Sequence, residues 1–211
     1  MDDRTRIFLI RHGQPEQHCG KIILGQYDTP LSETGEGEAR QAAEKLLSEG
    51  ARIKRIYSSN LLRAMQTAEI ISGKLGIVPI IPIVPFREMA MGKWDGELIE
   101  DIKAKFPEEF ARRGEDIRNY RIPGGENFHD LSERVLKEFH RIKKEDFQDA
   151  KEDPGDFVIV AHIGVLSVII DDLKNRNTGD SFLDMDFPTG SVTVYDIPDW
   201  DDKGDVPRVL S

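Results

Sequence analysis

Two short apolar runs, far apart in the chain, each lead directly to a histidine. The first run covers residues 7–10 (IFLI) and is broken at once by Arg11-His12-Gly13, and the second covers residues 157–161 (FVIVA) and ends at His162. Uninterrupted apolar runs of this length predict strands that are buried in a sheet. A helical pattern follows each histidine turn, so both strands are typical of an α/β protein.

Apolar runs and helical patterns alternate along the rest of the chain, which supports the α/β prediction. The predicted elements are a helix over 32–49, a strand over 53–57, a helix over 61–75, an edge strand within 78–86, a helix over 128–142 and a final strand over 191–197. Ser32 is the expected N-cap of the first helix, and Gly50 follows its end. Ser58-Ser59-Asn60 offers capping side chains to the second helix.

The 211 residues fit one domain, because no linker or internal repeat divides them. We therefore expect a single domain over residues 1–211. Residues 97–122 are charged and weakly helical, and we expect them to form a helical insertion that covers one end of the sheet.

The net charge is -10, with 29 basic against 39 acidic side chains. This acidity argues against nucleic acid or an anionic membrane as a partner, and it requires that an anionic substrate be bound by a local group of positive side chains. The one cysteine, Cys19, fits a reducing compartment, and the N-terminal apolar run is too short for a secretory signal. We expect a cytoplasmic protein.

The two histidine turns also suggest a binding site. In open α/β sheets, ligands bind beyond the carboxyl ends of the strands, so His12 and His162 would face one pocket if their strands are neighbours. Arg11 and Arg63 could join them, and guanidinium groups match the oxygens of phosphate. A histidine after a strand is often only structural, however, and an arginine in the first turn of a helix is usually solvated. The residues alone leave both interpretations open.

Several segments together resemble the histidine phosphatase superfamily, which includes the cofactor-dependent phosphoglycerate mutases. The segments, in order, are residues 11–13 (RHG), 25–35 (GQYDTPLSETG), 58–68 (SSNLLRAMQTA), 87–96 (REMAMGKWDG) and 160–162 (VAH). The resemblance runs from about residue 6 to residue 197, nearly the whole chain. The short motif at 11–13 is weak by itself, but the five segments in this order are specific.

The resemblance implies a three-layer sandwich with a mixed, mostly parallel central sheet flanked by helices. It also implies hydrolysis of a phosphate monoester through a phosphohistidine on His12, with Arg11, Arg63 and His162 holding the phosphoryl oxygens and Glu88 donating a proton to the leaving group. Fixed positive groups would offset the charge of the transition state, so no metal or other cofactor is expected. The attacking imidazole must be neutral, and a backbone carbonyl that accepts its other N–H would fix that tautomer.

The chain departs from the superfamily pattern at Gln14, His18 and Ile163. His18 stands where an asparagine is common and is a further candidate to bind a phosphate oxygen. Ile163 replaces a glycine and is expected to alter the pocket wall. Glu126, in a loop that resembles a superfamily loop, either supports the site from behind or caps the helix that follows.

Three functions compete. A phosphatase is favoured over a mutase because the insertion after Glu88 carries no arginine cluster beyond Arg112-Arg113. A non-catalytic phosphate-binding module is disfavoured because the sequence contains all five expected site residues, namely Arg11, His12, Arg63, Glu88 and His162. The substrate would be a small-molecule phosphate ester, and the opening Arg-His-Gly-Gln-Pro-Glu resembles the α-ribazole phosphatase branch. The resemblance also allows a homodimer.

Overall fold

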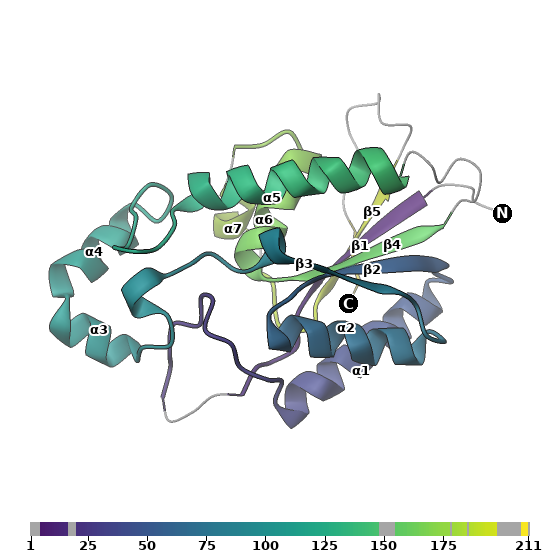
Figure 1. Cartoon of the computed structure of the whole chain (residues 1–211), viewed down its shortest axis with the longest axis horizontal. Coiled ribbons are helices and arrows are strands. Elements are labelled where there is room, and N and C mark those ends of the chain that lie inside the picture. The colour runs from purple at the N-terminus through teal and green to yellow at the C-terminus, as the bar shows by residue number, and fades with distance from the viewer. Residues whose placement is uncertain are drawn as a thin grey trace.

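A six-stranded sheet runs through the middle of the protein in this computed structural model, and helices cover both of its faces (Figure 1). The structure describes residues 5–16, 20–147, 155–177, 179–184, 186–197 and 208–210. The strands, in spatial order, are β3 (Ile80–Ile83), β2 (Ile53–Ser59), β4 (Asp156–Ala161), β1 (Thr5–Arg11), β5 (Val192–Ile197) and β6 (Arg208–Leu210). The first four are parallel, β5 is antiparallel to β1, and β6 is antiparallel to β5, which confirms the mixed, mostly parallel sheet.

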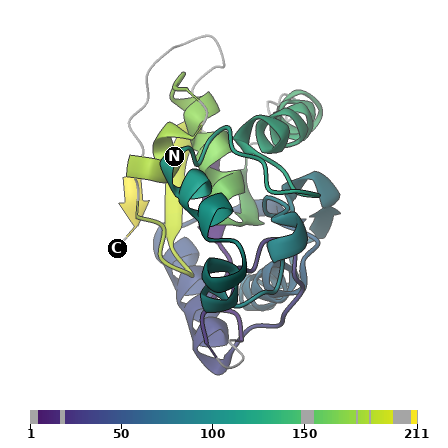
Figure 2. The ribbon, with the colours of Figure 1, turned by 90° about the vertical axis from the view of Figure 1, so that its left-hand side faces the viewer.

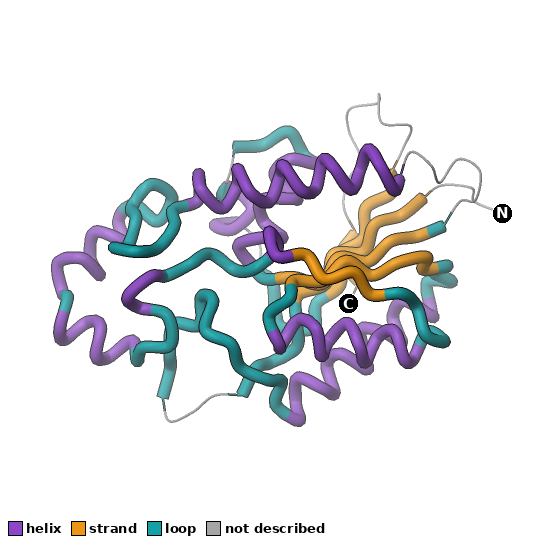
Figure 3. The backbone as a smooth tube through the Cα atoms, in the orientation of Figure 1, coloured by secondary structure: helices purple, strands orange, loops and turns teal. Residues whose placement is uncertain are grey.

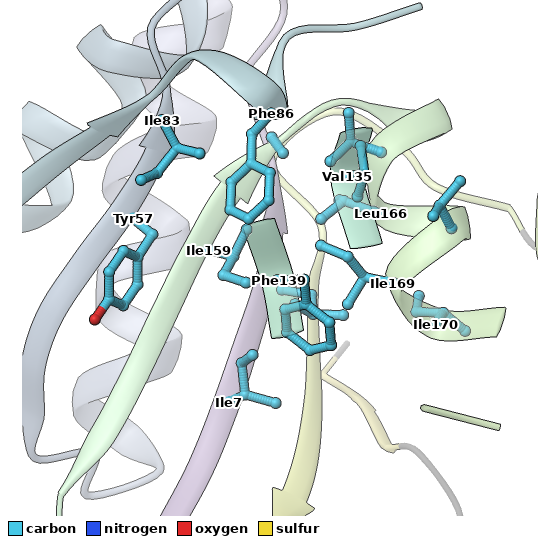
Figure 4. Close-up of a cluster of buried hydrophobic side chains, with 14 of the residues drawn as sticks. Ile7, Tyr57, Ile83, Phe86, Val135, Phe139, Ile159, Leu166, Ile169 and Ile170 are labelled. Carbon is cyan, nitrogen blue, oxygen red and sulfur yellow. The ribbon is translucent and has the colours of Figure 1, made fainter. Parts of the chain in front are cut away.

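Strand β1 shows why the sheet needs a helical layer on each face. Ile7 and Leu9 point into a core shared with α5 (Phe128–Ile142) and α6 (Ile163–Leu173), and part of this core is drawn in Figure 4. Phe8 and Ile10 point into a second core, shared with α1 (Glu33–Ser48) and α2 (Leu62–Lys74). Because side chains alternate between the faces of a strand, a fully apolar run requires apolar cover on both sides. The three predicted layers are confirmed.

The remaining helical segments are short. They are the 3₁₀ turns η1 (Val84–Phe86) and η2 (Gly92–Trp94), the helices α3 (Ile99–Lys105), α4 (Pro107–Glu115) and α7 (Asp180–Asp184), and the π-helical turn η3 (Lys143–Phe147). None of the helices in the described ranges is long and apolar enough to cross a membrane.

Helices α3 and α4 lie to one side of the sheet, as the ribbon and the tube both show (Figures 1 and 3), and they stand in front of it in the end-on view of Figure 2. Two backbone hydrogen bonds join them to the loop after β1: Ile23 N donates to Glu97 O at 2.9 Å, and Ile99 N donates to Lys21 O at 2.9 Å. A small separate core of Trp94, Ile102 and Ile122 holds this region together. It therefore stands next to the loop that follows His12.

Two details of the prediction are confirmed and two are wrong. Ser32 caps α1 by accepting a hydrogen bond from Gly35 N at 3.1 Å, and Gly50 follows the helix with a positive φ of 61°. Helix α2 has no side-chain cap from residues 58–60; instead Asp28, 34 positions earlier, accepts from Leu62 N at 2.6 Å. Strand β5 is not the last strand, because β6 pairs with it, and three residues are too few to show an alternating pattern.

Asp156 ties three chain segments together at the amino end of β4, the end opposite His162. Its Oδ1 accepts hydrogen bonds from Arg6 N at 3.0 Å and Arg6 Nε at 3.1 Å. Its Oδ2 accepts from Arg6 Nη2 at 2.7 Å and from Arg52 N at 2.8 Å. The carboxylate is buried, so loss of these bonds leaves donors unpaired in a poorly solvated place.

We therefore predict that Asp156→Ala lowers the free energy of unfolding by about 3 kcal/mol, as measured by urea denaturation. Asp184→Ala, which removes an exposed ion pair with Arg176, should cost less than about 1 kcal/mol. Equal costs for the two variants would contradict the prediction.

Candidate active site

The two histidines lie side by side because their strands pair. β1 and β4 are parallel neighbours, with Arg11 opposite Ala161, and His12 N donates to Ala161 O at 3.0 Å. The imidazole rings of His12 and His162 are 4.9 Å apart between centroids. Their exposed fractions are 3% and 0%. The predicted meeting of the two turns is confirmed.

One tautomer of His12 is fixed by the backbone. Nδ1 lies 2.7 Å from the carbonyl oxygen of Gly13, which can only accept, so Nδ1 carries the hydrogen and Nε2 keeps its lone pair. Arg63 Nε donates to that lone pair at 3.3 Å. Burial, the positive charge of Arg63 and that of Arg11 together hold the pKa of His12 well below its ordinary value of 6.5, although the bond to Gly13 opposes them. The imidazole is therefore neutral, with its lone pair on Nε2.

The turn that carries His12 is packed against two helices. A Cβ on Gly13 would lie 2.3 Å from the carbonyl oxygen of Gly35 in α1, so no other residue fits there. Gly13 N donates to Thr67 Oγ1 in α2 at 3.0 Å. The next residue, Gln14, donates its backbone N–H to Glu38 Oε2 at 2.7 Å, and its side-chain Oε1 accepts from Ser32 Oγ at 3.4 Å.

Arg63 is 1% exposed, and the loop before α1 holds its guanidinium group. Nη1 donates to Tyr27 O and Nη2 donates to Gly25 O, each at 2.8 Å. Nε donates to His12, so one N–H remains on each of Nη1 and Nη2. The segment at 25–35 therefore presents Arg63 to the pocket with hydrogens still available for an anion.

Arg11 is held more loosely than Arg63. Its Nη1 donates to Phe187 O, while its Nε is buried and has no hydrogen-bond partner among the described residues. Burial lowers the pKa of both arginines from its ordinary value, and the nearby carboxylate of Glu88 opposes this shift most strongly in each case. Both guanidinium groups therefore lie near Glu88.

His162 has one buried ring nitrogen, Nδ1, with no hydrogen-bond partner among the described residues. Its Nε2 lies 2.8 Å from Ser59 Oγ, which already accepts a hydrogen bond from Leu61 N at 3.3 Å. The tautomer of His162 that accepts from the Ser59 hydroxyl at Nε2 carries its hydrogen on Nδ1. Burial, followed by the charge of Arg63, lowers the pKa of His162 well below 6.5.

Glu88 lies on the loop after η1, at the N-terminus of α6. Its Oε1 accepts from Met89 N at 2.7 Å, and its Oε2 accepts from Gly164 N at 3.2 Å. A Cβ on Gly164 would lie 2.4 Å from Oε1, so the glycine makes room for the carboxylate. The neighbouring Ile163 packs against the core under α5 and α6.

The structure thus brings together Arg11, His12, Arg63, Glu88 and His162. His18 and Cys19 lie outside the described residues. Ser59 and Thr67 contact His162 and Gly13, and no sequence signal distinguished them from the other residues of the segment at 58–68.

Glu126 does not cap α5, so that alternative is wrong. Asn127 is the N-cap, and it forms a capping box with Asp130. Glu126 is instead paired with Arg134, a residue that the sequence analysis did not single out. In the described ranges, no group of three or more His, Cys, Asp or Glu side chains is arranged to hold a metal ion.

Residues 7–205 match the family model of the histidine phosphatase superfamily (branch 1), and the chain belongs to this superfamily. The superfamily and the phosphatases of similar fold make the chain a histidine-type phosphatase.

Two curated relatives are named as mutases. The chain is 32% identical to a 2,3-bisphosphoglycerate-dependent phosphoglycerate mutase of Parvibaculum lavamentivorans, over 96% of this chain and 93% of the relative. It is 37% identical to a probable phosphoglycerate mutase, GpmB, of Salmonella typhi, over 62% of this chain. The matched region spans only 59% of that relative's length.

Two solved structures of similar fold are phosphatases. The α-ribazole phosphatase from Shigella flexneri superposes with a TM-score of 0.80 at 25% identity, over 92% of each chain. The mycobacterial glucosyl-3-phosphoglycerate phosphatase superposes with a TM-score of 0.75 at 28% identity, over 90% of this chain and 92% of that one.

The two buried histidines predict that stability falls in mild acid. Each has a folded-state pKa below the ordinary value of 6.5, so below about pH 6.5 the unfolded chain binds more protons than the folded one. The contribution of the two histidines to the free energy of unfolding is complete above that pH. It is lost as the pH falls, by up to about 1.4 kcal/mol per pH unit for each histidine. Urea unfolding between pH 7.5 and 5 measures the slope. His162→Gln should have a shallower slope than the wild type, and equal slopes would contradict the prediction.

Proposed function

We propose that His12 is the nucleophile of a phosphomonoesterase. The observation that carries this proposal is the bond from His12 Nδ1–H to Gly13 O, because it places the lone pair of the imidazole on Nε2 in a buried, positively charged site. A bond from Nε2 to phosphorus would replace the hydrogen bond that Nε2 accepts from Arg63 Nε. Nε2 would form a bond to phosphorus as the ester P–O bond breaks. The resulting phosphoimidazolium keeps its hydrogen on Nδ1, which still donates to the carbonyl oxygen of Gly13.

The phosphoryl oxygens would be held by Arg11, Arg63 and His162. Arg63 has a free N–H on each terminal nitrogen, Arg11 has the unpartnered Nε, and His162 has the unpartnered Nδ1. These donors are already in place and buried, so the site needs little rearrangement to stabilise charge on the transferring group. On this basis we propose that no metal ion takes part.

Glu88 would move the protons. It lies near both arginines, and protonated Glu88 would give its proton to the ester oxygen that leaves. The resulting carboxylate would then take a proton from the water that attacks the phosphohistidine. Release of inorganic phosphate would return neutral His12 and protonated Glu88, so the cycle closes without a co-reactant.

The substrate we propose is a small organic phosphate ester, with α-ribazole phosphate as the first to test. The similarity to the α-ribazole phosphatase supports this choice, and the glucosyl-3-phosphoglycerate phosphatase shows that another ester is handled on the same fold. Failure of α-ribazole phosphate in a panel where other esters are hydrolysed well would rule it out.

Phosphoglycerate mutase activity is the second candidate, because the Parvibaculum relative matches nearly the full length of the chain. A mutase would convert 3-phosphoglycerate to its isomer in the presence of 2,3-bisphosphoglycerate without releasing phosphate. We favour hydrolysis over mutase activity because the insertion after Glu88 carries no arginine cluster beyond Arg112-Arg113.

Three further expectations remain predictions: that the chain is a single domain, that it acts in the cytoplasm and that it forms a homodimer.

The nucleophile is tested with p-nitrophenyl phosphate. We expect activity to survive EDTA and to fall by at least about 10³-fold in His12→Ala, whereas His129→Ala, an exposed histidine on α5, should match the wild type. Activity that is lost with EDTA, or that persists in His12→Ala, would contradict the proposal.

The fit between Glu88 and Gly164 gives a second test. Gly164→Ala places a Cβ where Oε1 lies, so the carboxylate must move, and turnover of an alkyl phosphate should fall by about 10²-fold. The new Cβ would also lie 3.1 Å from Leu131 Cδ2, but stability should change little, because alanine favours a helix by about 1 kcal/mol over glycine and offsets this contact. Gly73→Ala in α2, where a Cβ meets nothing within 4 Å, is the matched control. Unchanged turnover in Gly164→Ala would count against the role of Glu88.

A further inference from the structure

An ion pair lies behind Glu88, between its loop and helix α5. Arg134 Nε donates to Glu126 Oε1 at 2.7 Å, and Arg134 Nη2 donates to Glu126 Oε2 at 2.8 Å, so the pair is bidentate. The two side chains are 22% and 20% exposed, which is too buried for an ordinary surface pair.

Every other hydrogen of the Arg134 guanidinium group goes to the backbone around Glu88. Nη1 donates to Pro85 O at 2.6 Å and to Arg87 O at 2.8 Å, and Nη2 donates to Glu88 O at 2.9 Å. With the two bonds to Glu126, these contacts use all five N–H groups that an arginine has. Arg134 therefore has no donor left for a substrate, and its role is to hold this loop.

Glu126 holds the same loop on the other side of Glu88. Its Oε2 accepts a hydrogen bond from Ala90 N at 2.9 Å, and its own N–H donates to Ala90 O at 2.8 Å. Gln26 adds a further bond from Nε2 to Glu88 O at 3.0 Å. The backbone is thus fixed before, at and after the residue that carries the carboxylate.

We propose that Arg134 and Glu126 are positioning residues that set the place of the Glu88 carboxylate relative to His12. The inference rests on the proposed role of Glu88 as proton donor. The ion pair fixes the backbone from residue 85 to residue 90, and Met89 N and Gly164 N then fix the two carboxylate oxygens. Proton transfer is sensitive to displacements of about 1 Å, so release of the loop should impair it selectively.

The identity of the cation matters for this role. A lysine would keep the positive charge, but its ammonium group has three hydrogens and cannot make five bonds in one plane. If geometry is what Arg134 supplies, Arg134→Lys should behave like Arg134→Gln.

The test compares kcat/KM for two esters, because this constant reports the formation of the phosphohistidine. p-Nitrophenyl phosphate has a leaving group that needs little protonation, whereas ribose 5-phosphate has an alkoxide that must be protonated. In Arg134→Gln we expect kcat/KM to fall by about 10²-fold for ribose 5-phosphate and by less than about threefold for p-nitrophenyl phosphate. Arg141→Gln, an exposed ion-paired arginine on the same helix, should leave both constants unchanged.

A double-mutant cycle separates positioning from a general structural effect. If Arg134 acts through Glu88, then Arg134→Gln should have almost no further effect on ribose 5-phosphate in a Glu88→Gln background. A loss that is equal for the two esters, a loss that is additive in the cycle, or wild-type behaviour of Arg134→Lys would overturn the inference.

The same experiment distinguishes failure of this inference from failure of the proposed function. In Glu88→Gln itself, kcat/KM should fall far more for ribose 5-phosphate than for p-nitrophenyl phosphate. If it does not, both the role of Glu88 and this inference are wrong. A selective loss in Glu88→Gln without one in Arg134→Gln overturns the inference alone. Should Arg134→Gln not fold, as judged by circular dichroism, Glu126→Gln takes its place, with an expected selective loss of about tenfold.

Discussion

The parallel pairing of β1 with β4 is the constraint on which the rest of the site depends. The register that sets Arg11 opposite Ala161 delivers two imidazoles to one place, from positions 150 residues apart. That pairing is held by apolar side chains on both faces, so the same residues that build the core also fix the distance between His12 and His162. The other elements add arginines and a carboxylate around this pair.

Burial determines the electrostatics of the site. Two neutral histidines lie with two guanidinium groups, and several N–H groups have no acceptor among the described residues. Buried donors without acceptors are costly, and a phosphoryl group would satisfy them. The arrangement is therefore complementary to an anion, although the overall charge of the protein is -10. A local site is thus enough to bind a negatively charged substrate.

The sequence predicted what depends on local pattern. The apolar runs indicated the strands that lead to His12 and His162, and Ser32 marked the start of α1 because its cap lies three residues away. Contacts between distant segments could not be predicted in this way. The cap of α2 comes from Asp28, and the partner of Glu126 is Arg134, whose five bonds depend on where a loop and a helix meet in space. The resemblance to a known superfamily, not the periodicity, singled out Glu88.

The most direct test of the phosphohistidine proposal is to trap the phosphoryl-enzyme. The protein would be mixed with p-nitrophenyl phosphate, quenched in base within one turnover and mapped by mass spectrometry, with ³¹P NMR used to assign the modified nitrogen. The fixed tautomer of His12 predicts a base-stable, acid-labile phosphate on Nε2 of His12. A phosphate on Nδ1, a phosphate on another residue, or turnover with no trapped intermediate would contradict it.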